Sequence, residues 1–188
     1  MPVPFLTPEQ YLAIDKRSER PSEYHDGEMF VIEAASPNHS QIQLNLGSVL
    51  REQLRASPCK ARGSSIRVRI PGGPYTYPDM VATCGEREYE ADGETLLNPT
   101  VVFEVLSPST ADFNLGRKFD WYRSIKSLLE YIVIEQNRRF ARRYTRQPDR
   151  KWILEEFEGM DAVLLVSSLN CAVPFPELYL DVEFEPEP

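Results

Sequence analysis

A nearly continuous apolar run over Val101–Leu106 is the feature that most constrains how this chain can fold. Strands covered on both faces of a sheet are apolar throughout, whereas strands with one wet face alternate apolar and polar residues. The run therefore predicts a central strand over 100–106, with further structure on each side. Glu104 interrupts this run. A buried carboxylate is costly unless it is paired, protonated or bound to a metal, so Glu104 requires a partner.

The pattern around this strand predicts a mixed α/β fold, formed as a single domain over residues 1–188 with extra β-structure at both ends. Thr7-Pro8 and Ser36-Pro37 are typical helix starts, and Asp26-Gly27 is typical of a hairpin turn. Expected helices cover 7–12, 36–57 and 109–126. Expected strands cover 24–32 as a hairpin, then 66–70, 77–83, 100–106, 128–134, 138–145, 151–157 and 163–166. The acidic end, 180–188, is expected to fray.

The net charge of −8 is distributed unevenly along the chain. Residues 138–151 carry seven basic side chains and one acid, whereas the residues after them carry nine acids and no base. Residues 1–137 account for the remaining −5. The overall acidity argues against binding of nucleic acid through bulk charge, but the basic segment leaves a local contact open.

Three cysteines, Cys59, Cys84 and Cys171, are far apart and form no CxxC pair. This spacing argues against a disulfide framework or a zinc cluster and favours a reducing, cytoplasmic setting. No apolar run approaches the roughly 20 residues that span a bilayer, so we expect no membrane association.

Asp79 is the natural companion of Glu104, because the two residues fall on successive expected strands. Two carboxylates brought together at a sheet repel each other unless a cation lies between them. A site with oxygen ligands alone favours Mg²⁺ or Mn²⁺ over zinc. The structural alternatives are a turn at Pro78-Asp79 and an ion pair between Glu104 and an arginine.

Further polar residues are placed to support such a site. Lys118 lies on the apolar face of the expected helix after Glu104, close to Tyr122, where it either reaches the carboxylates or extends to solvent at the rim. His39 lies on the inner face at the start of the long helix, where it either binds a phosphate or assists proton transfer, or is a structural histidine that contacts a backbone group. In the expected hairpin, either Glu23 or Glu28 can supply a further carboxylate if it is not simply solvated, and Glu28 is the supporting candidate together with His39 and Tyr122.

Taken together, these motifs resemble the Uma-two family of restriction-endonuclease-like proteins. The matching segments are Pro78-Asp79, 104–110 with Lys118 and Tyr122, Glu-x-x-Asp-Gly-Glu at 23–28, Ser-Pro-x-His at 36–39, and 129–133. The resemblance implies the PD-(D/E)xK nuclease fold, in which two carboxylates bind Mg²⁺ and a lysine positions the attacking water. Asp79 and Glu104 then take the two carboxylate roles. The usual lysine position holds Leu106, and Lys118 looks like the lysine moved to the following helix.

The sequence thus predicts a Mg²⁺- or Mn²⁺-dependent endonuclease that hydrolyses DNA, with Asp79, Glu104 and Lys118 as catalytic residues. The alternative is a DNA-binding or assembly module that retains the fold without the chemistry. By analogy with enzymes that cut both strands of a duplex, we expect a homodimer. The candidate contacts to the phosphate backbone are Arg67, Arg69, Arg139, Arg142 and Arg143. For the last three, a charged edge strand paired with the acidic tail is the structural alternative.

Overall fold

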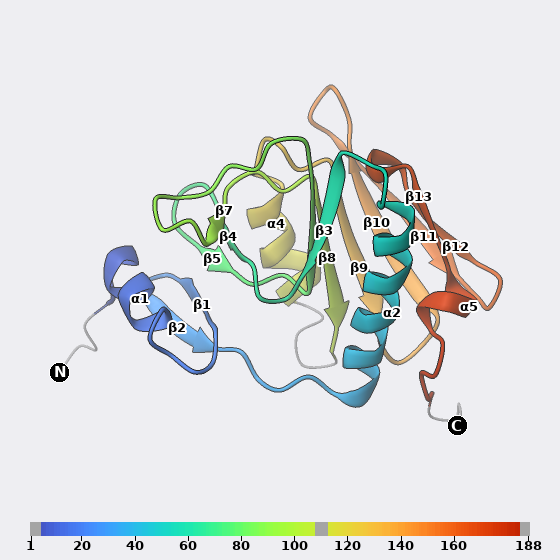
Figure 1. Cartoon of the computed structure of the whole chain (residues 1–188), viewed down its shortest axis with the longest axis horizontal. Coiled ribbons are helices and arrows are strands. Elements are labelled where there is room, and N and C mark those ends of the chain that lie inside the picture. The colour runs from blue at the N-terminus through green and yellow to red at the C-terminus, as the bar shows by residue number, and fades with distance from the viewer. Residues whose placement is uncertain (1–4, 108–112, 185–188) are drawn as a thin grey trace.

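Three β-sheets and their covering helices make up the computed structural model, which describes residues 5–107 and 113–184 (Figure 1). The largest sheet has the order β11-β10-β9-β8-β6-β3, with bounds Trp152–Glu158, Phe140–Arg146, Glu130–Glu135, Val101–Leu106, Met80–Cys84 and Cys59–Gly63. A second sheet has the order β2-β1-β5-β4-β7, with bounds Glu28–Val31, Ser22–His25, Tyr75–Thr76, Arg67–Arg69 and Thr95–Leu96. Strands β12 (Val163–Val166) and β13 (Cys171–Pro174) form a third. The structure confirms the mixed α/β class.

Strand β8 lies inside the large sheet, as its apolar run predicts. It pairs parallel with β9 and antiparallel with β6, and all six of its residues are buried. Val101, Phe103 and Val105 belong to one hydrophobic cluster, and Val102 and Leu106 belong to the cluster on the opposite face. Because side chains alternate along a strand, Glu104 points into the second of these layers.

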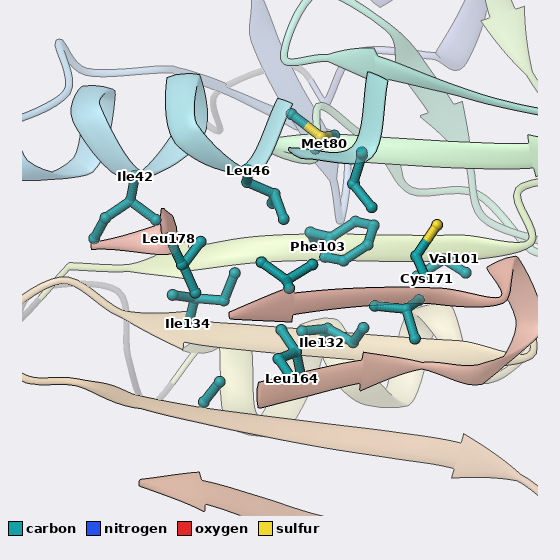
Figure 2. Packing of buried hydrophobic residues seen from close by; sticks show 14 of the residues in the cluster. Ile42, Leu46, Met80, Val101, Phe103, Ile132, Ile134, Leu164, Cys171 and Leu178 are labelled. Carbon is teal, nitrogen blue, oxygen red and sulfur yellow. The ribbon is translucent and has the colours of Figure 1, made fainter. Parts of the chain in front are cut away.

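Helix α2 (Pro37–Gln53) covers the first face of the large sheet. Its N-cap Ser36 accepts a hydrogen bond from the His39 amide, and Pro37 occupies the first turn, as expected from the sequence. Ile42, Leu46 and Leu50 recur at i+4 spacing, are fully buried and belong to one cluster with Val101, Phe103 and Ile132. Figure 2 shows Ile42 and Leu46 pointing from the helix toward the sheet. No described helix is long and apolar enough to cross a membrane.

The opposite face is covered by a π-helical turn, η1 (Asn114–Lys118), and by α4 (Phe119–Tyr122). The sequence predicts one α-helix over 109–126, of which residues 108–112 lie outside the described parts of the chain. The described part is shorter and begins with wider turns. Gly116 lowers the α-helical propensity there, and the inward-facing Lys118 forms ion pairs that stabilise the altered geometry.

The N-terminal elements pack around a cluster of tyrosines, which fixes the position of β1. In α1 (Pro8–Asp15), Thr7 and Gln10 form a capping box. Tyr11 stacks on Tyr24 of β1 with ring centroids 4.9 Å apart, and Tyr75 of β5 completes the cluster. The packing holds β1 beside β5, with the outer strand β2 at the edge.

The segment before residue 185 is ordered against the body of the protein, contrary to the prediction that 180–188 frays. After α5 (Phe175–Leu178), Val182 is buried and Phe184 packs on the core. The Asn38 side chain donates to the Glu183 carbonyl at 2.7 Å. The prediction is therefore wrong for 180–184, because alternate apolar residues anchor the acidic segment. Residues 185–188 lie outside the described parts.

A disulfide joins Cys59 of β3 to Cys84 of β6, whereas the sequence argues against disulfides. The two cysteines stand directly opposite each other in the strand register, a proximity that sequence separation conceals. Cys171 is buried and unbonded. The bond fastens the edge strand β3 to the large sheet.

Breaking this bond is expected to destabilise the protein. It closes a loop with a sequence separation of 25 residues, for which loop-closure entropy gives about 3 kcal/mol of the free energy of unfolding. Urea unfolding of Cys84→Ser, or of the parent with reductant, should show this loss. Cys171→Ala serves as the control that retains the reductant effect. Three reactive thiols in the denatured, unreduced parent, instead of one, would contradict the pairing.

Candidate functional site

Glu104 lies in a buried network with Lys118 and Tyr122. Its Oε1 atom is 3.2 Å from Lys118 Nζ and accepts a 3.0 Å hydrogen bond from the Tyr122 hydroxyl. Burial raises the pKa of Glu104 to about 7, although the Lys118 ammonium opposes this shift, and the nearby carboxylates of Asp79 and Glu23 raise it further. The predicted inward lysine and tyrosine are therefore both at the carboxylate.

Lys118 also contacts a second carboxylate, Glu23 of β1, with Nζ 2.9 Å from Oε1. The same Glu23 oxygen accepts a hydrogen bond from the Tyr77 amide at 3.2 Å. Burial disfavours the charge on Lys118, but the Glu104 and Glu23 carboxylates outweigh this effect and hold its pKa above the ordinary value. Lys118 thus remains a cation that can donate hydrogen bonds.

Glu28, the other acid of the hairpin motif and a predicted supporting residue, is exposed on the edge strand β2. The structure brings Glu23 to the site instead, because the inner strand β1 lies next to β5. The motif contains two acids at similar positions, and only the strand order distinguishes them. The preference for Glu28 is corrected to Glu23 on this ground.

Asp79 lies immediately before β6, beside Glu104, because Met80 pairs with Phe103 in the register of β6 and β8. Asp79 Oδ2 accepts a 2.6 Å hydrogen bond from the Val105 amide and lies 3.2 Å from His39 Nε2. Its Oδ1 accepts a 2.6 Å hydrogen bond from Gln43. Burial alone would lower the pKa of His39, but its hydrogen bond and charge interaction with Asp79 raise it.

Helix α2 supplies both of these partners. His39 lies in its first turn, and Gln43 follows one turn later on the same face. The sequence singles out His39 but not Gln43, which an i+4 search from His39 would have found. Asp79 with His39 forms one group and Glu104 with Lys118 and Tyr122 another, and the two groups adjoin through the register of β6 and β8 and the charge interaction of the two carboxylates.

The local charge and the donor types suit a divalent cation. Asp79, Glu104 and Glu23 provide three carboxylates, whereas Lys118 provides one fixed positive charge. Among the described residues, no group of three His, Cys, Asp or Glu side chains is already arranged around one point. Mg²⁺ is commonly held by one or two carboxylates together with water and substrate phosphate. Asp79, immediately before β6, and Glu104, on the neighbouring strand β8, are the oxygen donors that fit this pattern.

Two predicted nucleic-acid contacts, Arg67 and Arg143, are wrong because their side chains are buried. Arg67 is 4% exposed and lies 2.7 Å from both Asp15 and Asp92. The alternation over 66–70 indicates that Arg67 and Arg69 lie on a solvent face. Asp15 of α1 and the loop with Asp92 cover Arg67, whereas Arg69 stays exposed. Arg143 is 6% exposed and pairs with Glu155.

The other three predicted contacts already have partners within the chain. Arg69 pairs with Glu90, and Arg142 pairs with Glu156 at 3.0 Å and with Glu135 at 3.5 Å. The Arg139 guanidinium lies 4.6 Å from the centre of the Phe184 ring. The pairing of β10 with β11 places the arginines of one strand against the glutamates of the next. Internal pairing with the acids of β11 therefore describes Arg142 and Arg143 better than a phosphate contact, although β11 and not β10 is the edge strand.

Comparisons with known proteins agree with this architecture. The sequence profile of the Uma2 family, described as "Putative restriction endonuclease", matches residues 8–181. A solved structure from Anabaena variabilis, described as a "putative nuclease belonging to DUF820", has a TM-score of 0.75 and 21% identity, and the match covers 93% of this chain and 97% of that one. This likeness concerns the fold.

Two Synechocystis proteins are similar in sequence. Uncharacterized protein slr1290 is 30% identical over 167 residues, which cover 88% of this chain and 87% of the relative. Uncharacterized protein sll1609 is 32% identical over the same length, covering 88% and 94%. Because the family profile matches residues 8–181 of this 188-residue chain, the chain belongs to the Uma2 family.

Proposed function

We propose that this protein is a Mg²⁺- or Mn²⁺-dependent endonuclease that hydrolyses DNA phosphodiester bonds. The single observation that carries the proposal is the buried Lys118 ammonium held between Glu104 and Glu23, beside Asp79. A protein interior does not retain an excess of carboxylates without a cation to balance them. Membership in the Uma2 family and the fold of a solved nuclease-like relative add independent support.

Hydrolysis forms a bond from water oxygen to phosphorus, breaks one phosphorus–oxygen ester bond, and leaves a phosphomonoester and an alcohol. Lys118, which stays protonated, would hold the attacking water or a phosphate oxygen by hydrogen bonding. Glu104 would orient that water and accept its proton. Tyr122 and Glu23 hold these two groups in place. A divalent ion on Asp79 and Glu104 would neutralise phosphate charge and acidify water.

The alternative is a DNA-binding or assembly module without catalysis. One observation favours it: hydrogen bonds from Val105, His39 and Gln43 satisfy Asp79 without any ion. In this alternative the cluster is structural, and added metal has little effect. We propose in either case that DNA is the partner. For the enzyme, we further propose that two copies act together on a duplex.

Binding of Mn²⁺ or Mg²⁺ is expected to stabilise the protein through Asp79 and Glu104. At an ion concentration about one hundred times its dissociation constant the gain is about 2.7 kcal/mol, or about 5–10 °C in Tm for a chain of this length. Differential scanning fluorimetry with and without EDTA measures the shift. Asp79→Asn should abolish it, and Glu28→Gln, which changes an exposed acid outside the cluster, should preserve it. An unchanged Tm in the parent would contradict the metal site.

A further inference from the structure

A basic hollow of about 550 Å³ lies between α2 and the edge strand β3, which run alongside each other in Figure 1. Four cationic side chains line it, and its lining contains no acid: Arg51, Arg55, Lys60 and Arg62. This basic hollow lies away from the hairpin arginines that the sequence singled out. In a chain with a net charge of −8, a concave cluster of four positive charges favours an anionic ligand.

Among the residues that the structure describes, the cations of the basic hollow have no acidic partners. None of the ion pairs within residues 5–107 and 113–184 involves Arg51, Arg55 or Arg62, whereas Arg67 and Arg142 are each paired twice. Lys60 donates to the backbone carbonyl of Ser57 at 3.0 Å and likewise takes part in no ion pair of the described residues. Arg51, Arg55 and Lys60 are exposed, and Arg62 is half-buried. These side chains can therefore meet a ligand from solvent.

The basic hollow borders the candidate active site through Met80, which lines the hollow and follows Asp79 in the chain. His39, Gln43, Gly47, Arg51 and Arg55 follow one another at i+4 spacing, in a row that winds around α2 and continues past its end. The first two contact Asp79, and the last two line the hollow. With a rise of about 1.5 Å per residue, Arg51 lies about 18 Å along the helix from His39. This is the length of about five nucleotides of a B-form strand.

Gly47 and Met80 form the junction between the two regions. Met80 follows Asp79 in the chain and packs against α2 (Figure 2). A Cβ atom at position 47 would lie 3.2 Å from Met80 Cε, so any side chain there would crowd the wall of the hollow. Gly63 pairs with Met80 in the sheet and lines the same wall. At position 47, the lack of a side chain leaves room for the Met80 side chain against α2.

We propose that the basic hollow binds the phosphodiester backbone of the DNA strand that is cut, several nucleotides from the scissile phosphate. The inference rests on the proposed function and adds where the substrate lies. The planar guanidinium of arginine can donate two parallel hydrogen bonds to two oxygens of a phosphate, and contacts to phosphate carry no sequence information. The hollow therefore fixes the position of the strand independently of its sequence.

The test measures DNA binding by the full chain carrying Glu104→Gln, which keeps the labelled oligonucleotide intact. Arg51→Ala, Arg55→Ala and Arg62→Ala are added singly and together, and fluorescence anisotropy is recorded over a range of KCl concentrations. Each single change should raise Kd about threefold to tenfold and reduce the slope of log K against log salt by about 0.9. If the three effects add in free energy, the triple variant should bind about 30-fold to 1,000-fold more weakly.

Arg138→Ala is the matched control, because it removes the same charge from a half-exposed arginine that is already paired with Glu135 at 2.7 Å. Its Kd should stay within twofold of the parent. In the otherwise unaltered enzyme, the three hollow variants should raise KM and leave kcat nearly unchanged. Urea unfolding checks that every variant is as stable as the parent.

Three outcomes would overturn the inference. If the parent cleaves DNA and the triple variant binds like Arg138→Ala, the basic hollow is not the strand-binding site, although the proposed function stands. If the triple variant loses kcat without a change in Kd, the hollow does not act by binding the strand. If the parent neither binds nor cleaves DNA, this inference and the proposed function are both wrong. Weaker DNA binding in the hollow variants, with parental binding in Arg138→Ala, would support the inference.

Discussion

Replacing Glu104 with glutamine is expected to lower DNA cleavage about a thousandfold while the fold remains intact. Glutamine keeps the shape of the side chain but removes both a metal-binding charge and the group that accepts a proton from water. Folding should survive because Lys118 retains its ion pair with Glu23 at 2.9 Å. The Tyr122 hydroxyl can still donate to the amide oxygen. Single-turnover cleavage of a labelled duplex, together with urea unfolding, measures both quantities.

The matched control for this substitution is Glu28→Gln, which removes the same charge from the same sequence motif as Glu23 but at an exposed position. It should cleave at the parental rate. Cleavage by Glu104→Gln at a rate near that of the parent would exclude Glu104 from the chemistry. Equal loss in both variants would mean that overall charge, and not the site, governs the rate.

The second large effect concerns stability: Lys118→Met is expected to lower the free energy of unfolding by about 3–5 kcal/mol. The substitution leaves the Glu104 and Glu23 carboxylates buried without their cation. Urea unfolding at neutral pH measures the loss. Lys126→Met, which changes an exposed lysine a few residues later, should alter the free energy by no more than about 0.5 kcal/mol.

A double variant distinguishes loss of charge balance from loss of packing. If the uncompensated carboxylates cause the instability, Glu23→Gln should recover part of the free energy that Lys118→Met removes. If Lys118→Met has the same free energy of unfolding as the parent, this cation does not hold the cluster together. Additive losses in the double variant would show that Glu23 and Lys118 do not interact.

The central strand and the first helices are predictable from local patterns alone. The run over 101–106 has the composition of a strand covered on both faces, and β8 is buried on both sides. Ser36-Pro37 combines a capping side chain with a residue suited to the first turn, so α2 begins where the sequence indicates. In each case the residues that determine the element are neighbours in the chain.

The candidate site could be predicted only in part, because much of it depends on strand order. Lys118 and Tyr122 follow from helical spacing, and both reach Glu104. Which of Glu23 and Glu28 reaches the site depends on which hairpin strand pairs with β5. The residues of the hairpin alone do not indicate this pairing. The disulfide between Cys59 and Cys84 likewise depends on the register of β3 and β6.

The arginines illustrate the same limit for charge. A basic hairpin followed by an acidic tail indicates either a phosphate contact or internal pairing, and the register of β10 and β11 decides for pairing. The sequence does not predict that Arg51, Arg55 and Arg62 lie together, because they are spread over the end of a helix and a strand. They gather only when β3 folds back beside α2.

Nicking of supercoiled plasmid with Mn²⁺, Mg²⁺ or EDTA is the measurement that tests the central claim most directly. The parent should nick and then linearise the plasmid in either metal and should be inactive in EDTA. Asp79→Asn, purified in parallel and folded to the same extent, should be inactive in all three conditions. Cleavage that persists in EDTA, or activity in Asp79→Asn equal to that of the parent, would contradict a metal-dependent nuclease built on this carboxylate pair.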